Sequence, residues 1–223
     1  MRYVLDASLI NVVVSRPRTG TTWLTVLLAS YLAYTYHLDI EQPFDDLLSH
    51  CQVAFTHDPQ RLDDVTSIAT DYTGRRVVLL LRDPRDAIAS AYAVEAQAQG
   101  VDVVDYATRT AKRFAAFYSE WLNVKNREDL RGFMTLTYEQ MHAHTLAALL
   151  QVVSFFGYDL DFTNARRAVT FGSLAQMRKL QQAGRFKNRV RNGKVGNYHT
   201  VLNDAALNAI TNAFGDLGIL WNL

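Results

Sequence analysis

Short apolar runs alternate along the chain with longer segments of helical character. Strands are indicated by apolar runs flanked by polar or turn-forming residues, at 11–14, 51–56, 75–82 and 132–138. Helices are predicted by the longer segments without breakers, at 21–36, 84–97, 102–125, 140–157 and 203–214. This alternation predicts one α/β domain over residues 1–223, a parallel β-sheet flanked by helices on both faces.

The first strand runs into a loop and then directly into a helix. Pro17 and Gly20 interrupt the apolar pattern, and the helix begins at Thr21. N–H groups at a helix start have no intrahelical partners, so an anion binds there readily, and Gly20 lets the backbone approach it closely. Thr21 and Thr22 add hydroxyl donors. A P-loop-like phosphate site is therefore expected here.

The loop departs from the Walker A pattern GxxxxGK[ST] in two places. If Gly20 is the second glycine, Ser15 replaces the first and Thr21 replaces the lysine, while cations stand at Arg16 and Arg18. NTPases use that lysine on the β- and γ-phosphates. Its loss favours a nucleotide without a γ-phosphate.

The run PRTGTTW at 17–23 resembles PKSGTTW, the 5′-phosphosulfate loop of sulfotransferases, which binds 3′-phosphoadenosine 5′-phosphosulfate (PAPS). Arg18 takes the position of the loop lysine, and the resemblance implies that it stabilises charge on the departing oxygen. The implied PAPS ligands in this loop are Arg18, Thr19, Gly20, Thr21, Thr22 and Trp23.

A second motif follows the strand at 75–82. Asp83 is suited to cap a helix and Pro84 to begin it. The run RDPRDAIAS resembles the 3′-phosphate motif RNPKDVAVS, which implies that Arg82 and Ser90 bind the 3′-phosphate. A structural alternative is an ion pair of Arg82 with Asp83 or Asp86.

His57 follows the strand at 51–56, where ligands bind in a parallel sheet. The triplet FTH resembles KTH, whose histidine removes the proton of the acceptor hydroxyl. The resemblance implies that His57 is the general base, although Phe55 replaces the lysine. A lone histidine at a strand end is otherwise often structural.

Three later segments complete the resemblance. TYEQM is similar to the YED segment, which implies that Tyr138 reaches the adenine. VTF at 169–171 resembles TSF, which implies adenine contacts from Thr170 and Phe171. VRNGKVGNY resembles RKGxxGDW, a segment that closes over the 3′-phosphate, and its implied ligands are Arg191, Asn192 and Gly193.

The resemblance implies a PAPS-dependent sulfotransferase that moves the sulfuryl group to a hydroxyl or amine of a small-molecule or carbohydrate acceptor. The nucleotide product would be adenosine 3′,5′-bisphosphate (PAP). The catalytic residues would be His57 and Arg18, and no metal is implied, because cationic side chains and helix N–H groups neutralise the charge. Two alternatives stay open: a P-loop nucleotide kinase, and a non-catalytic nucleotide or RNA binder.

Charge and composition bear on these alternatives. The net charge is +1, yet no acidic residue occurs between Asp161 and Asp204, and this basic segment suits a polyanionic ligand or is a solvated loop. Aromatic residues are too sparse there to favour nucleic acid as a partner. The single cysteine, and the lack of a signal peptide or membrane-length apolar run, favour a cytoplasmic protein without a membrane partner. The sequence leaves the oligomeric state open.

Overall fold

Four parallel strands form the centre of the computed structural model, which describes residues 10–57, 72–186, 190 and 193–215. In spatial order the sheet reads β2-β1-β3-β4. The strands are β1 (Asn11–Ser15), β2 (Val53–Thr56), β3 (Arg76–Leu81) and β4 (Gly132–Thr137). The apolar runs in the sequence predicted all four.

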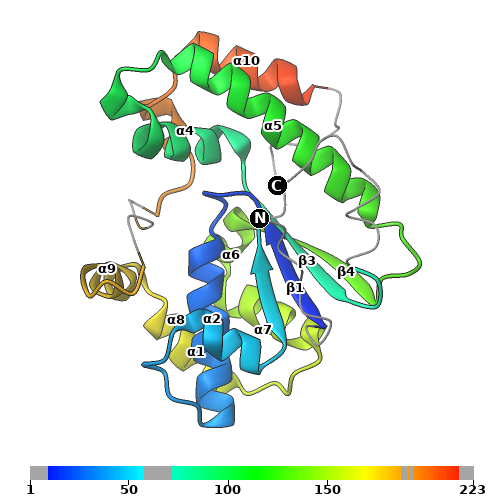
Figure 1. Cartoon of the computed structure of the whole chain (residues 1–223). Helices are drawn as coiled ribbons and strands as arrows, with labels where there is room; N and C mark the ends of the chain where they lie inside the picture. Colours follow the sequence, from blue (N-terminus) through cyan, green and yellow to red (C-terminus); the bar gives the residue numbers. More distant parts are fainter. Residues whose placement is uncertain (1–9, 58–71, 187–189, 191–192, 216–223) are drawn as a thin grey trace.

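Helices connect and cover these strands, as Figure 1 shows. Those before β4 are α1 (Thr21–Tyr36), α2 (Phe44–His50), α4 (Pro84–Glu95) and α5 (Val103–Val124), with the 3₁₀ turn η1 (Gln97–Gln99). Those after it are α6 (Tyr138–Ala143), α7 (Thr145–Phe156), α8 (Phe162–Phe171), α9 (Leu174–Gln182) and α10 (Asp204–Phe214), with the 3₁₀ turn η2 (Asn197–Thr200).

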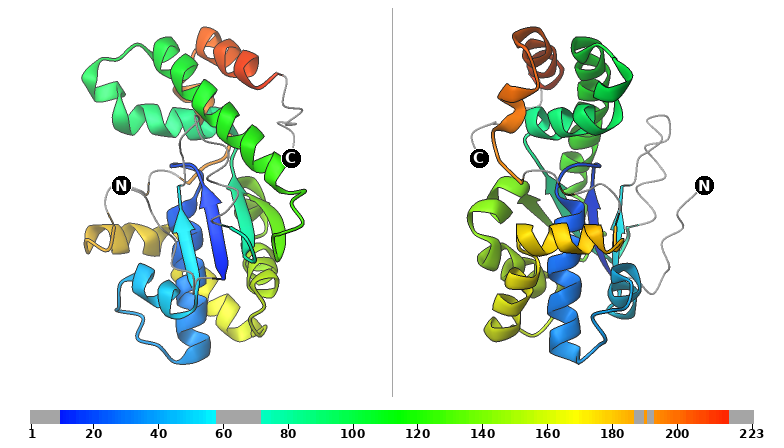
Figure 2. Two further views of the ribbon diagram at one scale, coloured as in Figure 1. Left: turned by 45° about the vertical axis from the view of Figure 1, so that its right-hand side comes forward. Right: turned by 90° about the vertical axis from the view of Figure 1, so that its left-hand side faces the viewer.

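Both faces of the sheet are buried, because successive side chains of a strand point to opposite faces. Val13 packs into a core with α1, α2, α7 and α8. Its neighbours Val12 and Val14 pack into a second core with α4, α5 and α10. The two helical layers lie on opposite sides of the strands (Figure 2). This confirms the predicted α/β fold with helices on both faces.

The structure corrects the predicted helix at 140–157. A capping box of Thr137 and Gln140 starts α6 directly after β4. The helix ends at Ala143, because the next residue, His144, has a non-helical φ and ψ of −139° and 54°. A new helix, α7, begins at Thr145. The basic segment after Asp161 is also more ordered than a loop, because it contains α8, α9 and η2.

All strands run in the same direction, so their carboxyl ends meet at one edge of the sheet. Ser15 ends β1, His57 follows β2, Arg82 follows β3 and Tyr138 follows β4. The topology thus brings the predicted site residues to one edge. Across the described part of the chain, no helix has the length and apolar character needed to cross a bilayer.

Candidate active site

A pocket of about 590 Å³ lies where the carboxyl ends of the strands meet the starts of α1 and α4. It is larger than a single small ion requires and falls in the range of small-molecule sites. The predicted residues that line it are Arg18, Gly20, Thr21, Thr22, Trp23, His57, Arg82, Ser90, Tyr138 and Gly193.

Thr19 does not line this pocket, and Arg191 and Asn192 lie outside the described residues. The Thr19 side chain is fully buried, and its Oγ1 donates to the Arg16 carbonyl at 2.7 Å. Thr19 therefore fixes the shape of the loop.

Thr170 and Phe171 lie in the last turn of α8 and do not line this pocket. They line a separate hollow beside α1, where the Phe171 ring meets Tyr34 edge-on with centroids 6.5 Å apart. Two side chains of α9, those of Leu174 and Met177, line the main pocket instead. Sequence reasoning missed these two residues, because it sought an aromatic ring and neither residue has one.

The loop before α1 has an unusual backbone. Arg18 and Gly20 have φ of 74° and 100°. A Cβ added at Gly20 would lie 2.6 Å from Cδ2 of Tyr138, so this position needs glycine for both its conformation and its space. The α1 start, with the hydroxyls of Thr21 and Thr22, consequently opens into the pocket.

His57 is oriented by the end of β1. Its Nδ1 lies 3.1 Å from the Ser15 carbonyl oxygen and 3.3 Å from Ser15 Oγ. A carbonyl oxygen only accepts, so Nδ1 carries the hydrogen and Nε2 keeps the lone pair. Ser15 Oγ is also 2.8 Å from Thr21 Oγ1, which ties the imidazole to the phosphate loop.

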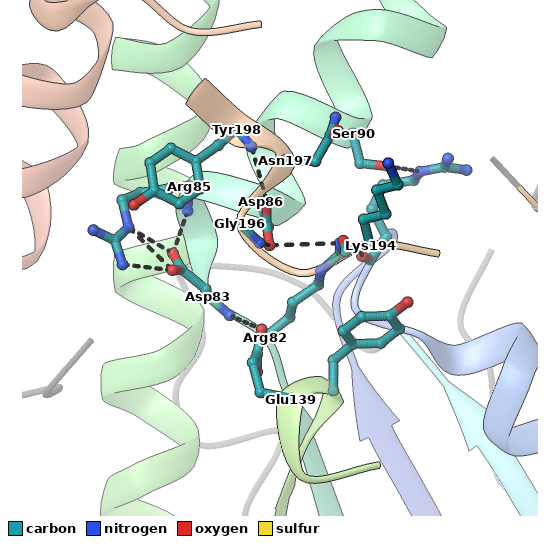
Figure 3. Close-up of polar contacts among 12 residues, drawn as sticks. Arg82, Asp83, Arg85, Asp86, Ser90, Glu139, Lys194, Gly196, Asn197 and Tyr198 are labelled. Atoms are coloured by element: carbon teal, nitrogen blue, oxygen red, sulfur yellow. Dashed lines mark hydrogen bonds and ion pairs between the residues drawn. The ribbon is translucent and has the colours of Figure 1, made fainter. Parts of the chain in front are cut away.

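Arg82 has several partners in the site (Figure 3). Its Nη1 and Nη2 donate to the carbonyls of Arg18 and Lys194 at 3.0 and 3.3 Å. The ion pair with Asp86, which the sequence left open, exists at 3.9 Å. The Nε group is buried and has no hydrogen-bond partner among the described residues. A buried donor without a partner is costly, and an anion would satisfy it.

Ser90 lies on α4, about one helical turn after Asp86. Its Oγ accepts a hydrogen bond from Arg18 Nε at 3.2 Å. This bond brings the two halves of the site together, because Arg18 comes from the loop after β1 and Ser90 from the helix after β3. The cationic end of the pocket thus combines charge and hydroxyl donors, as a phosphate or sulfate group requires.

An apolar wall completes the pocket. The rings of Trp23 and Tyr138 lie with centroids 5.7 Å apart, tilted by 60°. Trp23 Nε1 donates to the Gly172 carbonyl at 2.9 Å, and the Tyr138 hydroxyl donates to the Gly193 carbonyl at 3.1 Å. Burial raises the pKa of Tyr138, so the hydroxyl stays protonated and able to donate. This wall suits a planar apolar group.

Solved structures show the same fold in known proteins. The first is retinol dehydratase in complex with androsterone and inactive cofactor PAP, with a TM-score of 0.64 and 14% identity, covering 99% of this chain and 84% of that chain. The second is mouse sulfotransferase SULT7A1 complexed with PAP, with a TM-score of 0.65 and 14% identity, covering 95% and 89%. No curated protein matches the sequence.

A match to a protein-family model identifies the family more directly than these structures do. The model described as the sulfotransferase domain matches residues 11–217, which includes every strand and every helix of the structure. The match begins at β1, so the loop, the strand ends and α4 all fall inside it. The chain therefore belongs to the sulfotransferase-domain family.

Proposed function

We propose that the protein transfers the sulfuryl group of PAPS to a hydroxyl or amine of an acceptor and leaves PAP as the nucleotide product. The observation that carries the proposal is the shared pocket of His57, Arg18 and Arg82. It presents a histidine of fixed tautomer, a cation beside a serine hydroxyl, and a buried guanidinium Nε that no described residue hydrogen-bonds.

The described residues fit PAPS part by part. The start of α1 with Thr21 and Thr22 would hold the 5′-phosphosulfate. Arg82 and Ser90 would hold the 3′-phosphate, and Gly193 would lie over it. Trp23 and Tyr138 would enclose the adenine, with Leu174 rather than Phe171 as the third apolar contact, since Leu174 lines the pocket.

Two side chains would carry the chemistry. Bound PAPS supplies the sulfuryl group. His57 accepts the acceptor proton at Nε2, and the resulting positive charge is delocalised over a ring anchored at Ser15. Arg18 remains charged at neutral pH and stabilises negative charge on the departing oxygen, but it does not serve as an acid, because its pKa is too high.

The acceptor is proposed as a small molecule or a carbohydrate. Retinol dehydratase, a protein of similar fold, has been solved in complex with androsterone and with retinol, both small molecules. Val94 and Glu95 at the end of α4 also line the pocket, so its wall includes one apolar and one acidic side chain there. A cytoplasmic location stays a prediction of the sequence.

A nucleotide kinase is the main rival. It requires a lysine for the β- and γ-phosphates, and Thr21 stands in that position. An RNA binder is disfavoured because Trp23 and Tyr138 line a concave pocket rather than a flat stacking platform.

Calorimetry with PAP and with ATP–Mg²⁺ separates these functions. We expect PAP to bind and ATP–Mg²⁺ to bind far more weakly. Arg82→Ala removes charge-assisted donors and should weaken PAP binding by roughly 10- to 100-fold. Preferential binding of ATP–Mg²⁺ would instead support the kinase.

Transfer from labelled PAPS to a panel of hydroxyl acceptors tests the base. His57→Ala should keep PAP affinity and reduce transfer by about 10²- to 10⁴-fold, since His57 acts on the acceptor proton. The control is His50→Ala, which changes an exposed histidine at the end of α2. Transfer at the wild-type rate by His57→Ala would show that another group removes the proton.

A further inference from the structure

A buried carboxylate joins the first turn of α4 to the segment Gly193–Tyr198, here called the closing segment. Asp86 is 2% exposed. Its Oδ2 accepts the Gly196 N–H at 2.7 Å, and its Oδ1 accepts the Tyr198 N–H at 3.0 Å (Figure 3). Both oxygens of one side chain therefore hold the backbone of a segment more than a hundred residues away in the sequence.

This arrangement is specific to a carboxylate. Burying a charged group is costly unless it is paired and hydrogen-bonded. Asp86 meets that requirement with two amide donors and, at 3.9 Å, with Arg82. An amide side chain in its place would turn an N–H₂ group toward one of the two backbone N–H groups, so one donor would lose its acceptor.

The closing segment is tied to the pocket at further points. Its Lys194 carbonyl accepts from Arg82, and its Gly193 carbonyl accepts from the Tyr138 hydroxyl. The guanidinium of Arg85 lies 4.5 Å over the Tyr198 ring. Gly196 has φ of 76°, a turn conformation that must be held by its surroundings. Asp86 acts at this turn, so its contacts set where the segment returns to the fold.

We propose that Asp86 is a positioning residue that holds the closing segment over the 3′-phosphate end of the pocket and so sets the preference for a 3′-phosphorylated nucleotide. The inference rests on the proposed function, in which Arg82 and Gly193 bind that phosphate. Without Asp86 the segment must be ordered when the ligand binds, and that cost reduces affinity.

The test compares two nucleotides and two variants by calorimetry. PAP carries the 3′-phosphate, and adenosine 5′-monophosphate (AMP) lacks it. Asp86→Asn should bind PAP roughly 10-fold more weakly while AMP affinity stays at the wild-type value. The control is Asp102→Asn: Asp102 caps α5 away from the pocket and accepts the N–H groups of Val104 and Asp105 through Oδ1 alone, so asparagine removes the charge and keeps both bonds.

Hydrogen exchange gives a second measurement. The amides of Gly196 and Tyr198 should exchange faster in Asp86→Asn and at the wild-type rate in Asp102→Asn. Arg85→Ala removes the cation that lies over the Tyr198 ring of the same segment, and it replaces Asp86→Asn if that variant fails to fold. It should also lower the PAP-to-AMP affinity ratio, by a smaller factor.

An unchanged PAP-to-AMP ratio in these variants would overturn the inference, as would an equal loss for both nucleotides, which indicates general damage to the pocket. Failure of the proposed function has a different signature: the wild-type protein would then bind PAP no better than AMP.

Discussion

The His57 imidazole is oriented by one backbone carbonyl. Ser15 ends β1, and its carbonyl oxygen lies 3.1 Å from Nδ1. Because this acceptor is part of the backbone, side-chain substitution cannot remove it. The tautomer is therefore built into the sheet edge, and Ser15 Oγ connects the same ring to Thr21 at the start of α1.

Gly20 is constrained both in its backbone conformation and in the space around it. It combines φ of 100° with a Cβ position 2.6 Å from the Tyr138 ring. Gly20→Ala should cost about 2 kcal/mol or more of stability and weaken PAP binding by roughly 10-fold, because the loop or the ring must move. Urea unfolding and calorimetry measure the two effects.

Gly100→Ala is the matched control. Gly100 also has a positive φ, of 67°, but an added Cβ there would meet no atom within 4 Å. It should lose only about 1 kcal/mol and keep PAP affinity. Equal effects of the two substitutions would show that the contact with Tyr138 does not matter.

At the scale of elements, α4 shows how local chemistry fixes a site. Asp83 caps it by accepting the Arg85 N–H at 2.9 Å, and Pro84 occupies the first position. The start of α4 is therefore locked directly after β3. That register turns Asp86 toward the closing segment and Ser90 toward Arg18.

The helix α10 contributes to the core and not to the pocket. Ile210 on α10 is fully buried in the core that α4 and α5 share with one face of the sheet. Ile210→Ala should reduce the free energy of unfolding by about 2–5 kcal/mol through loss of packing. PAP affinity of the folded protein should not change, because Ile210 does not line the pocket.

The exposed Asn208 on the same helix provides the comparison. Asn208→Ala should stay within about 0.5 kcal/mol of wild type. Denaturant unfolding with and without PAP measures both variants. A loss of PAP affinity in Ile210→Ala would mean that the α5–α10 layer holds the pocket in shape.

At the scale of the whole molecule, folding shifts the pKa of buried ionisable groups, as Glu139 shows. Burial raises the pKa of Glu139, although its hydrogen bonds with backbone N–H groups, including that of Asp83, and the Arg82 charge oppose this. Its folded pKa thus exceeds its unfolded pKa, so between the two values the folded state binds more protons. Stability must then fall as pH rises through that window.

Glu139→Gln removes this titration and keeps the carbonyl oxygen that accepts the Asp83 N–H. Its unfolding free energy should fall less than that of wild type as pH rises above the ordinary pKa of a glutamate, about 4.3. Urea unfolding across this range measures the slope, with the exposed Glu128→Gln as the control. Identical slopes in wild type and Glu139→Gln would refute the linkage.

The sheet edge and most of the pocket could be predicted from the sequence. The β-branched runs predict buried strands, and Gly20, Asp83 and Pro84 mark where helices begin, because these preferences act between residues close in the chain. Parallel strands then bring His57, Arg82 and Tyr138 to one edge whatever the details of packing. These elements confirmed the predicted fold.

Only the tertiary structure decided which side chains complete the pocket. The rotation of α8 about its own axis turns Phe171 toward Tyr34, and Leu174 at the start of α9 faces the pocket instead. The break at His144 and the bonds from Asp86 to Gly196 and Tyr198 also depend on distant partners. Such contacts are set by how whole layers pack, so no local pattern of residues encodes them.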